Sequence, residues 1–178
     1  MIDIQTTKDL VQERIMGNRK WSETPCYLHS YSVYESLNKY GYSDDIQLAW
    51  LLHDIVEDGD TSLKELEQLW YTDQVVYLVD LASHDESISD KYTRRSTMMQ
   101  RILDENNQDA FIIKLADYHD NLKDCLTMPD SSKRNKFLQV KWSFFARRWH
   151  HYDWNSELYK DFLLRYHNQI NTLYPLFN

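Results

Sequence analysis

Glycine and proline, the residues that most often mark turns, are scarce in this chain: each occurs only three times in 178 residues. A sheet-rich or mixed α/β fold of this size would normally use more of them. Apolar residues recur instead at the three- and four-residue spacing of a helix that packs by one face. The sequence therefore predicts an all-α fold.

Helical patterns account for most of the chain. They cover residues 7–16, 26–40, 45–55, 75–82, 93–103, 109–126, 132–152 and 156–173. Residues 45–55 are apolar on nearly every side, which is typical of a helix buried in the middle of a domain. Ser62 and Glu65 form a capping box that predicts a further helix start, and Gly41 predicts a helix stop. The valine-rich segment 75–82 leaves a short strand open as an alternative.

The length of the chain suits one domain with a sizeable core. We find no internal repeat, low-complexity tract or linker, and we expect a single domain over residues 1–178. The formal net charge is −8, which argues against a nucleic-acid partner because proteins that bind phosphate backbones usually carry a basic stripe. This charge leaves open a small anionic substrate that a metal and a few local cations would hold.

The sequence shows no targeting or membrane signal. Its first 16 residues are charged and lack the apolar stretch of a signal peptide. No apolar run approaches the roughly 18 residues that a membrane span needs. Cys26 and Cys125 are isolated, which predicts free thiols in a reducing compartment. We therefore expect a cytoplasmic protein with no membrane partner.

The stretch WLLHDIVEDGD, residues 50–60, places His53 and Asp54 directly after an apolar run. Asp117 also follows an apolar run, and His29 lies in the preceding helix. A carboxylate that an apolar helix carries inward needs a partner or a metal. Two imidazoles and two carboxylates suit Mn, Fe, Co or Zn, with positions left open for water and substrate. These four residues are candidate metal ligands.

Glu57 and Asp58 lie one helical turn after His53 and Asp54. A carboxylate in that place can take a proton from an attacking water or hold the water in line. The alternative is a solvated acidic helix end, which is less favourable because acidic residues there oppose the helix dipole. The remaining histidines are expected to be ordinary core or surface residues, namely His84, His119, His150, His151 and His167.

Three further polar residues are candidate substrate contacts. Asn121 lies one turn after Asp117 and shares its face of the helix. Its neutral amide can hold a phosphate oxygen, a sugar hydroxyl or a base edge. Arg19 and Lys20 lie shortly before His29 and could neutralise substrate phosphates, with a solvated basic pair as the alternative.

Together these residues resemble the HD-domain metal-dependent phosphohydrolases. The finer similarity is to the (p)ppGpp hydrolase branch, which comprises the hydrolase domain of Rel/SpoT proteins and small stand-alone alarmone hydrolases of the Mesh type. That branch has an Arg-Lys pair, PY-x-x-H, HD-x-x-ED followed soon by Thr, and KLAD-x-x-x-NL. This chain has RK at 19–20, PCYLH at 25–29, HDIVEDGDTS at 53–62 and KLADYHDNLKD at 114–124. The resemblance covers roughly residues 8–150.

The resemblance implies an HD-domain helical bundle with a buried metal site, in which residues from about 150 to 178 are packing helices. The implied metal ligands are His29, His53, Asp54 and Asp117, with manganese as the usual ion. The implied water-activating pair is Glu57 and Asp58. The implied nucleotide contacts are Arg19, Lys20, Asn121 and, from a looser alignment, Lys136.

The activity that the resemblance implies is removal of 3′-pyrophosphate from ppGpp, pppGpp or a related alarmone. Such an enzyme would act in housekeeping or as the antidote to a toxic alarmone synthetase. Two alternatives remain: a nucleotidase or dNTP hydrolase of the wider superfamily, and a non-catalytic scaffold or antitoxin that binds a partner through the aromatic segment 141–154. The many tyrosines leave self-association open.

The chain departs from the family pattern near the proposed substrate. Its loop before His29 is one residue longer than usual, and Gly59 and Asp60 are inserted where the family goes directly to Thr. Tyr118 occupies the position after Asp117, where the family typically has Arg or Lys. These departures concern the choice of substrate more than the metal ligands.

Overall fold

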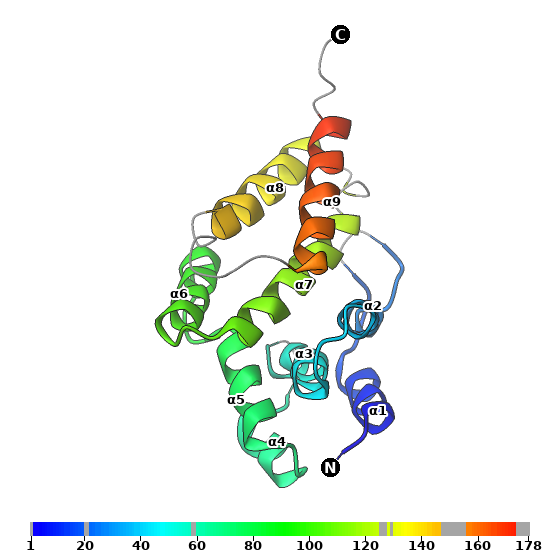
Figure 1. The fold of residues 1–178 in the computed structure, drawn as a ribbon, viewed down its shortest axis with the longest axis vertical. Helices are drawn as coiled ribbons and strands as arrows, with labels where there is room; N and C mark the ends of the chain where they lie inside the picture. Colours follow the sequence, from blue (N-terminus) through cyan, green and yellow to red (C-terminus); the bar gives the residue numbers. More distant parts are fainter. Residues whose placement is uncertain are drawn as a thin grey trace.

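The computed structural model describes residues 2–19, 22–57, 60–124, 128, 130–146 and 156–173. Within these ranges the chain forms helices and one isolated bridge, between Asn18 and Pro25. The helices are α1 (Ile4–Arg14), α2 (Tyr27–Lys39), α3 (Asp44–Glu57), α4 (Leu63–Gln68), α5 (Asp73–Ala82), α6 (Lys91–Asp104), α7 (Gln108–Asp124), α8 (Ser131–Ala146) and α9 (Glu157–Leu173). The prediction of an all-α fold is confirmed (Figure 1).

Local sequence signals set several of the helix boundaries. The Ser62 hydroxyl accepts a hydrogen bond from the backbone N–H of Glu65 at 3.2 Å and caps α4, as the capping box predicted. Gly41 has a φ of +74° directly after α2, a left-handed conformation that favours glycine at a helix end. Thr72 caps α5 through the N–H of Val75. The valine-rich segment is therefore helical, and the alternative of a short strand is wrong.

Helix α3 is the centre of the core. Figure 1 shows it between α5 on one side and α1 and α2 on the other, and it packs against all three and against α7. Trp50, Leu51 and Leu52 are fully buried, as expected for a helix that is apolar on nearly every side. Truncating one such leucine to alanine would cost ~2–5 kcal/mol. The polar end of α3 therefore rests on a well-packed scaffold.

Helix α7 connects this core to the C-terminal part of the chain. It packs against α2, α3, α5, α6 and α9. Gln169 of α9 donates a hydrogen bond to the Leu122 carbonyl at 2.9 Å, and Arg165 donates to the His119 carbonyl at 3.1 Å. Helix α9 thus packs on the far end of α7, the helix that carries Asp117.

Some predictions concern parts of the chain outside the described residues. The aromatic segment 141–154, named above as a possible partner surface, is one, since the side chains of residues 140–146 and the whole of residues 147–155 are outside the description. Cys26 forms no disulfide within the described part of the chain, whereas Cys125 lies outside the described ranges. Among the described helices, none has the length and apolar character needed to cross a membrane.

Candidate metal centre

The candidate ligands come from three helices that pack on one another. His29 lies in the first turn of α2, His53 and Asp54 in the last turn of α3, and Asp117 in the middle of α7. Helices α2, α3 and α7 are in mutual contact. The Trp50 ring joins the two histidines, with its centroid 5.4 Å from the His29 ring and 4.2 Å from the His53 ring. The packing of α3 on α2 therefore brings both imidazoles to one place.

His53 and Asp54 form the first pair. The His53 side chain is 1% exposed, and its Nε2 lies 2.9 Å from Asp54 Oδ1. His53 Nδ1 lies 2.7 Å from the backbone carbonyl oxygen of Trp50. A carbonyl can only accept, so Nδ1 carries the proton. The other carboxylate oxygen of Asp54 accepts a hydrogen bond from the Ser30 hydroxyl at 3.2 Å.

His29 and Asp117 form the second pair, which crosses from α2 to α7. His29 Nε2 lies 3.2 Å from Asp117 Oδ1, and His29 Nδ1 lies 2.6 Å from Asp120 Oδ2. The side chains of His29 and Asp117 are 11% and 13% exposed. Two carboxylates from one helix therefore flank a single imidazole.

The donor set of both pairs fits a divalent cation. In a neutral His53 ring the Nε2 lone pair faces the acceptor oxygen of Asp54, because Nδ1 holds the ring proton. The same lone pair of His29 faces Asp117 once Nδ1 donates to Asp120. Two acceptors at such distances repel unless a proton or a cation lies between them. Imidazole nitrogens with carboxylate oxygens are suitable ligands for a first-row divalent metal.

The ionisable groups respond to one another strongly in the metal-free protein. Burial lowers the pKa of His29, but hydrogen bonds to Asp117 and Asp120 outweigh it and raise this pKa to about 9. Burial raises the pKa of the Asp54 carboxyl, yet the adjacent His53 ring holds it well below its ordinary value. Without a metal, His29 therefore keeps its proton at neutral pH, and Asp54 keeps its negative charge.

Glu57, the expected water-activating residue, contacts Lys114 and His84. Its Oε1 accepts hydrogen bonds from the Lys114 ammonium at 3.2 Å and from the His84 backbone N–H at 3.1 Å. Its Oε2 lies 3.0 Å from His84 Nδ1. Burial raises the pKa of Glu57, but the Lys114 charge and the His84 hydrogen bond lower it below its ordinary value. Glu57 is therefore a fixed, ionised carboxylate.

Glu57 also lies where it could be a metal ligand itself. One ligand atom each of His53, Asp54 and Glu57 lie within 4.8 Å of one another, which is a group that could hold a metal ion. The sequence predicts that His29 and Asp117 are metal ligands and that Glu57 lies next to the metal without binding it. A cation bound by the α3 residues alone is thus the competing arrangement.

The expected substrate contacts differ in their outcome. Arg19 donates a hydrogen bond to Asn121 Oδ1 at 2.9 Å, and the Asn121 amide donates to Asp117 Oδ1. These residues therefore adjoin the second pair. Lys136 is exposed on α8, and no interaction in the described part of the chain links it to the centre. Lys20 and Asp58 lie outside the described residues.

Sequence reasoning missed three groups that contact the centre. Asp120 shares a face of α7 with Asp117, three residues before it, and this spacing was an available signal. Lys114 is 1% exposed within the KLAD motif, and a lysine flanked by Ile113 and Leu115 could have suggested a buried ion pair. His84 was expected to be an ordinary residue. Its contact with Glu57 is tertiary, and no local pattern predicts it.

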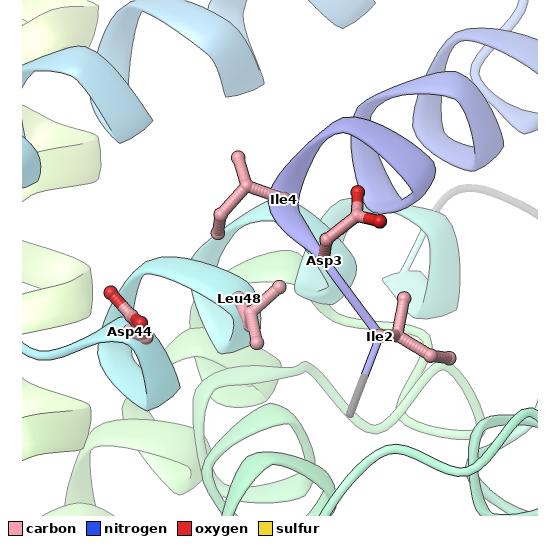
Figure 2. A pocket seen from close by; sticks show the side chains of 5 residues that line it. All are labelled: Ile2, Asp3, Ile4, Asp44 and Leu48. Carbon is pink, nitrogen blue, oxygen red and sulfur yellow. The ribbon is translucent and has the colours of Figure 1, made fainter.

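A separate pocket of about 260 Å³ opens between the beginnings of α1 and α3 (Figure 2). Its lining residues are Ile2, Asp3, Ile4, Asp44 and Leu48. None of them is a candidate ligand or substrate contact, and its two charged groups are carboxylates, which repel phosphate. This pocket is therefore not suited to the phosphorylated substrate that the sequence implies.

The chain is similar to known proteins in part of its sequence and in its fold. No family model matches the chain. The chain is 36% identical over 104 residues to the guanosine-3′,5′-bis(diphosphate) 3′-pyrophosphohydrolase MESH1 of Drosophila melanogaster. These residues are 57% of this chain and 56% of the fly protein, so the similarity spans little more than half of that relative.

Two solved structures share the fold. The first is described as a metazoan orthologue of SpoT that hydrolyses ppGpp; it has a TM-score of 0.76, is 21% identical, and the match covers 99% of both chains. The second is lmo0812 of Listeria monocytogenes EGD-e, with a TM-score of 0.62 and 20% identity over 83% of this chain and 99% of that one. The resemblance found in the sequence is confirmed: the chain is homologous to a ppGpp pyrophosphohydrolase over 104 residues and has the helical fold of a ppGpp-hydrolysing orthologue of SpoT.

Proposed function

We propose that this protein is a manganese-dependent hydrolase that removes 3′-pyrophosphate from ppGpp, pppGpp or a related guanosine alarmone. The observation that carries the proposal is a set of two His–Asp pairs whose histidines both contact the Trp50 ring, with the ionised carboxylate Glu57 close to His53 and Asp54. The homology to a fly enzyme named for this reaction supports the substrate. The proposal places the whole reaction in one HD-type domain.

The residues that would hold the cation are His29, His53, Asp54 and Asp117. When bound, a divalent ion polarises a phosphate oxygen and makes a nearby water more acidic. The protein's part is to hold the ring proton of each histidine on Nδ1, which leaves Nε2 beside Asp117 in His29 and beside Asp54 in His53. The Trp50 carbonyl does this for His53.

Glu57 would hold the attacking water in line by accepting its hydrogen bond. Its lowered pKa makes it a weak proton acceptor at neutral pH, so orientation is the larger part of its role. Asp58, the neighbouring carboxylate, is proposed as its partner and as the proton acceptor. One water adds to phosphorus, the bond from phosphorus to the 3′ oxygen breaks, and that oxygen takes up a proton.

The nucleotide would approach from the side of Arg19 and Asn121. The Arg19 guanidinium donates a hydrogen bond to Asn121, which contacts Asp117. In this place the guanidinium could instead form a bidentate pair with a phosphate. Lys20 and Lys136 are proposed as further phosphate contacts. Arg19→Ala should raise KM for ppGpp more than it lowers kcat, because a phosphate contact made equally in ground and transition states contributes to binding alone.

The test is a panel of ppGpp, pppGpp, ppApp, NADPH and dNTPs, incubated with the purified protein with and without Mn²⁺. We expect pyrophosphate release from ppGpp, abolished by a chelator and by Asp54→Ala, and lowered ~10²–10⁴-fold by Glu57→Ala. Hydrolysis of dNTPs in preference to ppGpp would place the protein among nucleotidases instead. Protein that binds no divalent metal and is inert with Mn²⁺ would favour the non-catalytic scaffold.

The biological setting follows from the same activity. A ppGpp hydrolase in the cytoplasm would serve as a housekeeping enzyme or as the antidote to a cognate alarmone synthetase. Co-expression with a toxic synthetase separates chemistry from binding: rescue that is lost in Asp54→Ala indicates hydrolysis, while rescue that persists indicates a partner contact. Sedimentation of the purified protein would establish whether it forms a homo-oligomer.

A further inference from the structure

Asp120 is the residue that decides how the His29 ring is presented. Its Oδ2 lies 2.6 Å from His29 Nδ1, on the side of the ring opposite to Asp117. A carboxylate accepts hydrogen bonds and cannot donate them when ionised, so Nδ1 must carry the proton. The remaining nitrogen, Nε2, then offers its lone pair toward Asp117 and the candidate cation.

Asp120 is itself held in place by residues of both helices. Its Oδ1 accepts a hydrogen bond from the Ser32 hydroxyl at 2.7 Å and pairs with the Lys123 ammonium. Lys123 also contacts the Ser32 hydroxyl at 2.7 Å. With Asp120 6% exposed, this network joins α2 to α7 beside the metal ligands. Burial raises the pKa of Asp120, but the His29 ring and Lys123 lower it well below its ordinary value, so the carboxylate is ionised.

The family pattern does not assign this residue. In KLAD-x-x-x-N the positions between Asp117 and Asn121 are unspecified, and Asp120 is the third of them. His53 needs no such residue, because a backbone carbonyl of its own helix fixes its ring. His29 lies in the first turn of α2, where its ring nitrogen reaches across to α7 instead. The Asp120 side chain therefore orients the His29 ring, as a backbone carbonyl orients the His53 ring.

We propose that Asp120 is a positioning residue for the metal site, which fixes the Nδ1–H form of His29 and thereby strengthens the bond that Nε2 makes to a divalent cation. The inference rests on the metal site of the proposed function and extends it by one residue outside the ligand set. Outer partners of this kind typically change metal affinity 10–100-fold.

The test compares Asp120→Asn with Asp80→Asn, which removes a carboxylate from an ion pair with Arg101 on the protein surface. Dissociation constants for Mn²⁺ and Zn²⁺ are measured by competition with a chromophoric chelator. We expect Asp120→Asn to weaken both metals ~10–100-fold and Asp80→Asn to change neither. At saturating Mn²⁺ the kcat for ppGpp should largely recover in Asp120→Asn, with the half-activating Mn²⁺ concentration raised by the same factor.

A direct reading of the ring separates positioning from a loss of folding. Nitrogen-15 spectra of the Zn²⁺-loaded protein should show His29 protonated at Nδ1 in the wild type, with that signal shifted or lost in Asp120→Asn. Asp120→Glu, which keeps a carboxylate, should restore part of the metal affinity, and circular dichroism should show all variants folded.

Two results would overturn the inference while leaving the proposed function intact. One is a metal affinity in folded Asp120→Asn within threefold of the wild type; the other is a His29 ring bound through Nδ1. Conversely, a wild-type protein that binds the metals with the expected Asp120 dependence but releases no pyrophosphate from ppGpp would refute only the proposed substrate.

Discussion

The two His–Asp pairs of the centre are alike in composition and different in construction. His53 and Asp54 are neighbours on one helix, and the His53 ring is fixed by a carbonyl three residues earlier. His29 and Asp117 are 88 residues apart and lie on different helices. Only the packing of α2 on α7 brings them together, and Asp120 supplies the orienting contact.

This difference shows which half of the centre depends on tertiary structure. The α3 pair is present whenever α3 is helical and buried, because all its groups belong to one turn. The pair between α2 and α7 exists only in the packed domain. We therefore expect a cation to stabilise the domain by joining the two pairs, since a ligand that binds only the native state favours folding.

The largest expected effect comes from removing one histidine from each pair. His29→Ala and His53→Ala should each weaken Mn²⁺ binding by more than the roughly 10–100-fold that an outer partner costs. If one cation is shared, the double variant should be little worse than either single one, because residues that act as a unit are not additive. Titration with Mn²⁺ checks this. Tight binding that survives His29→Ala would show that the pairs do not share an ion.

The next largest effect concerns the buried ion pair between Lys114 of α7 and Glu57 of α3. Lys114→Met removes a buried ammonium group that contacts Glu57. The side chains of Lys114 and Glu57 are 2% and 10% exposed, respectively. Breaking a buried ion pair in this way costs ~3–5 kcal/mol of unfolding free energy. The matched control is Lys160→Met, whose partner Glu157 is exposed, and it should cost at most about 1 kcal/mol. Urea denaturation of both variants measures the difference; equal costs would show that the buried pair adds nothing.

The pair between α2 and α7 should make the metal-free domain sensitive to alkaline pH. The pKa of His29 is raised from 6.5 to about 9 in the folded protein. A raised pKa contributes stability that is fully present below 6.5 and is lost as the pH rises through 9. The urea midpoint of the chelator-treated protein should therefore decrease as the pH rises from 6.5 to about 9. In His29→Gln the slope over this interval should be flatter, and an unchanged slope would refute the assignment to His29.

The smallest effects come from the two serines that support the carboxylates. Ser32→Ala removes the 2.7 Å hydrogen bond to Asp120, and Ser30→Ala removes the 3.2 Å hydrogen bond to Asp54. Each should lower the unfolding free energy by ~0.5–1.5 kcal/mol. Ser32→Ala should also weaken Mn²⁺ binding, but less than Asp120→Asn does. A stronger effect of Ser30→Ala on metal affinity would mean that the α3 pair, not the α7 pair, needs side-chain support.

The sequence predicted the fold well because its determinants are local. Scarce turn residues, the Ser62 cap and the all-round apolar character of α3 each follow from neighbouring residues, and the helices appear where these signals placed them. The strand alternative for the valine-rich segment failed because Thr72 caps a helix there. β-branched residues alone did not decide between the two.

The candidate site was predictable only as far as its motifs reach. The motifs named the residues that would act, but not which atoms face one another. Asp120 and His84 were missed because their contacts join segments 91 and 27 residues apart. Lys136, which came from a loose alignment alone, remains a prediction, as do Lys20 and Asp58.

The most direct test of the account is anomalous diffraction from crystals grown with Mn²⁺. We predict a single manganese peak bonded to Nε2 of His29 and His53 and to carboxylate oxygens of Asp54 and Asp117. Glu57 should face a water rather than the ion. No peak at this place, or a peak held by His53, Asp54 and Glu57 without His29, would contradict the claim that the two pairs share one cation.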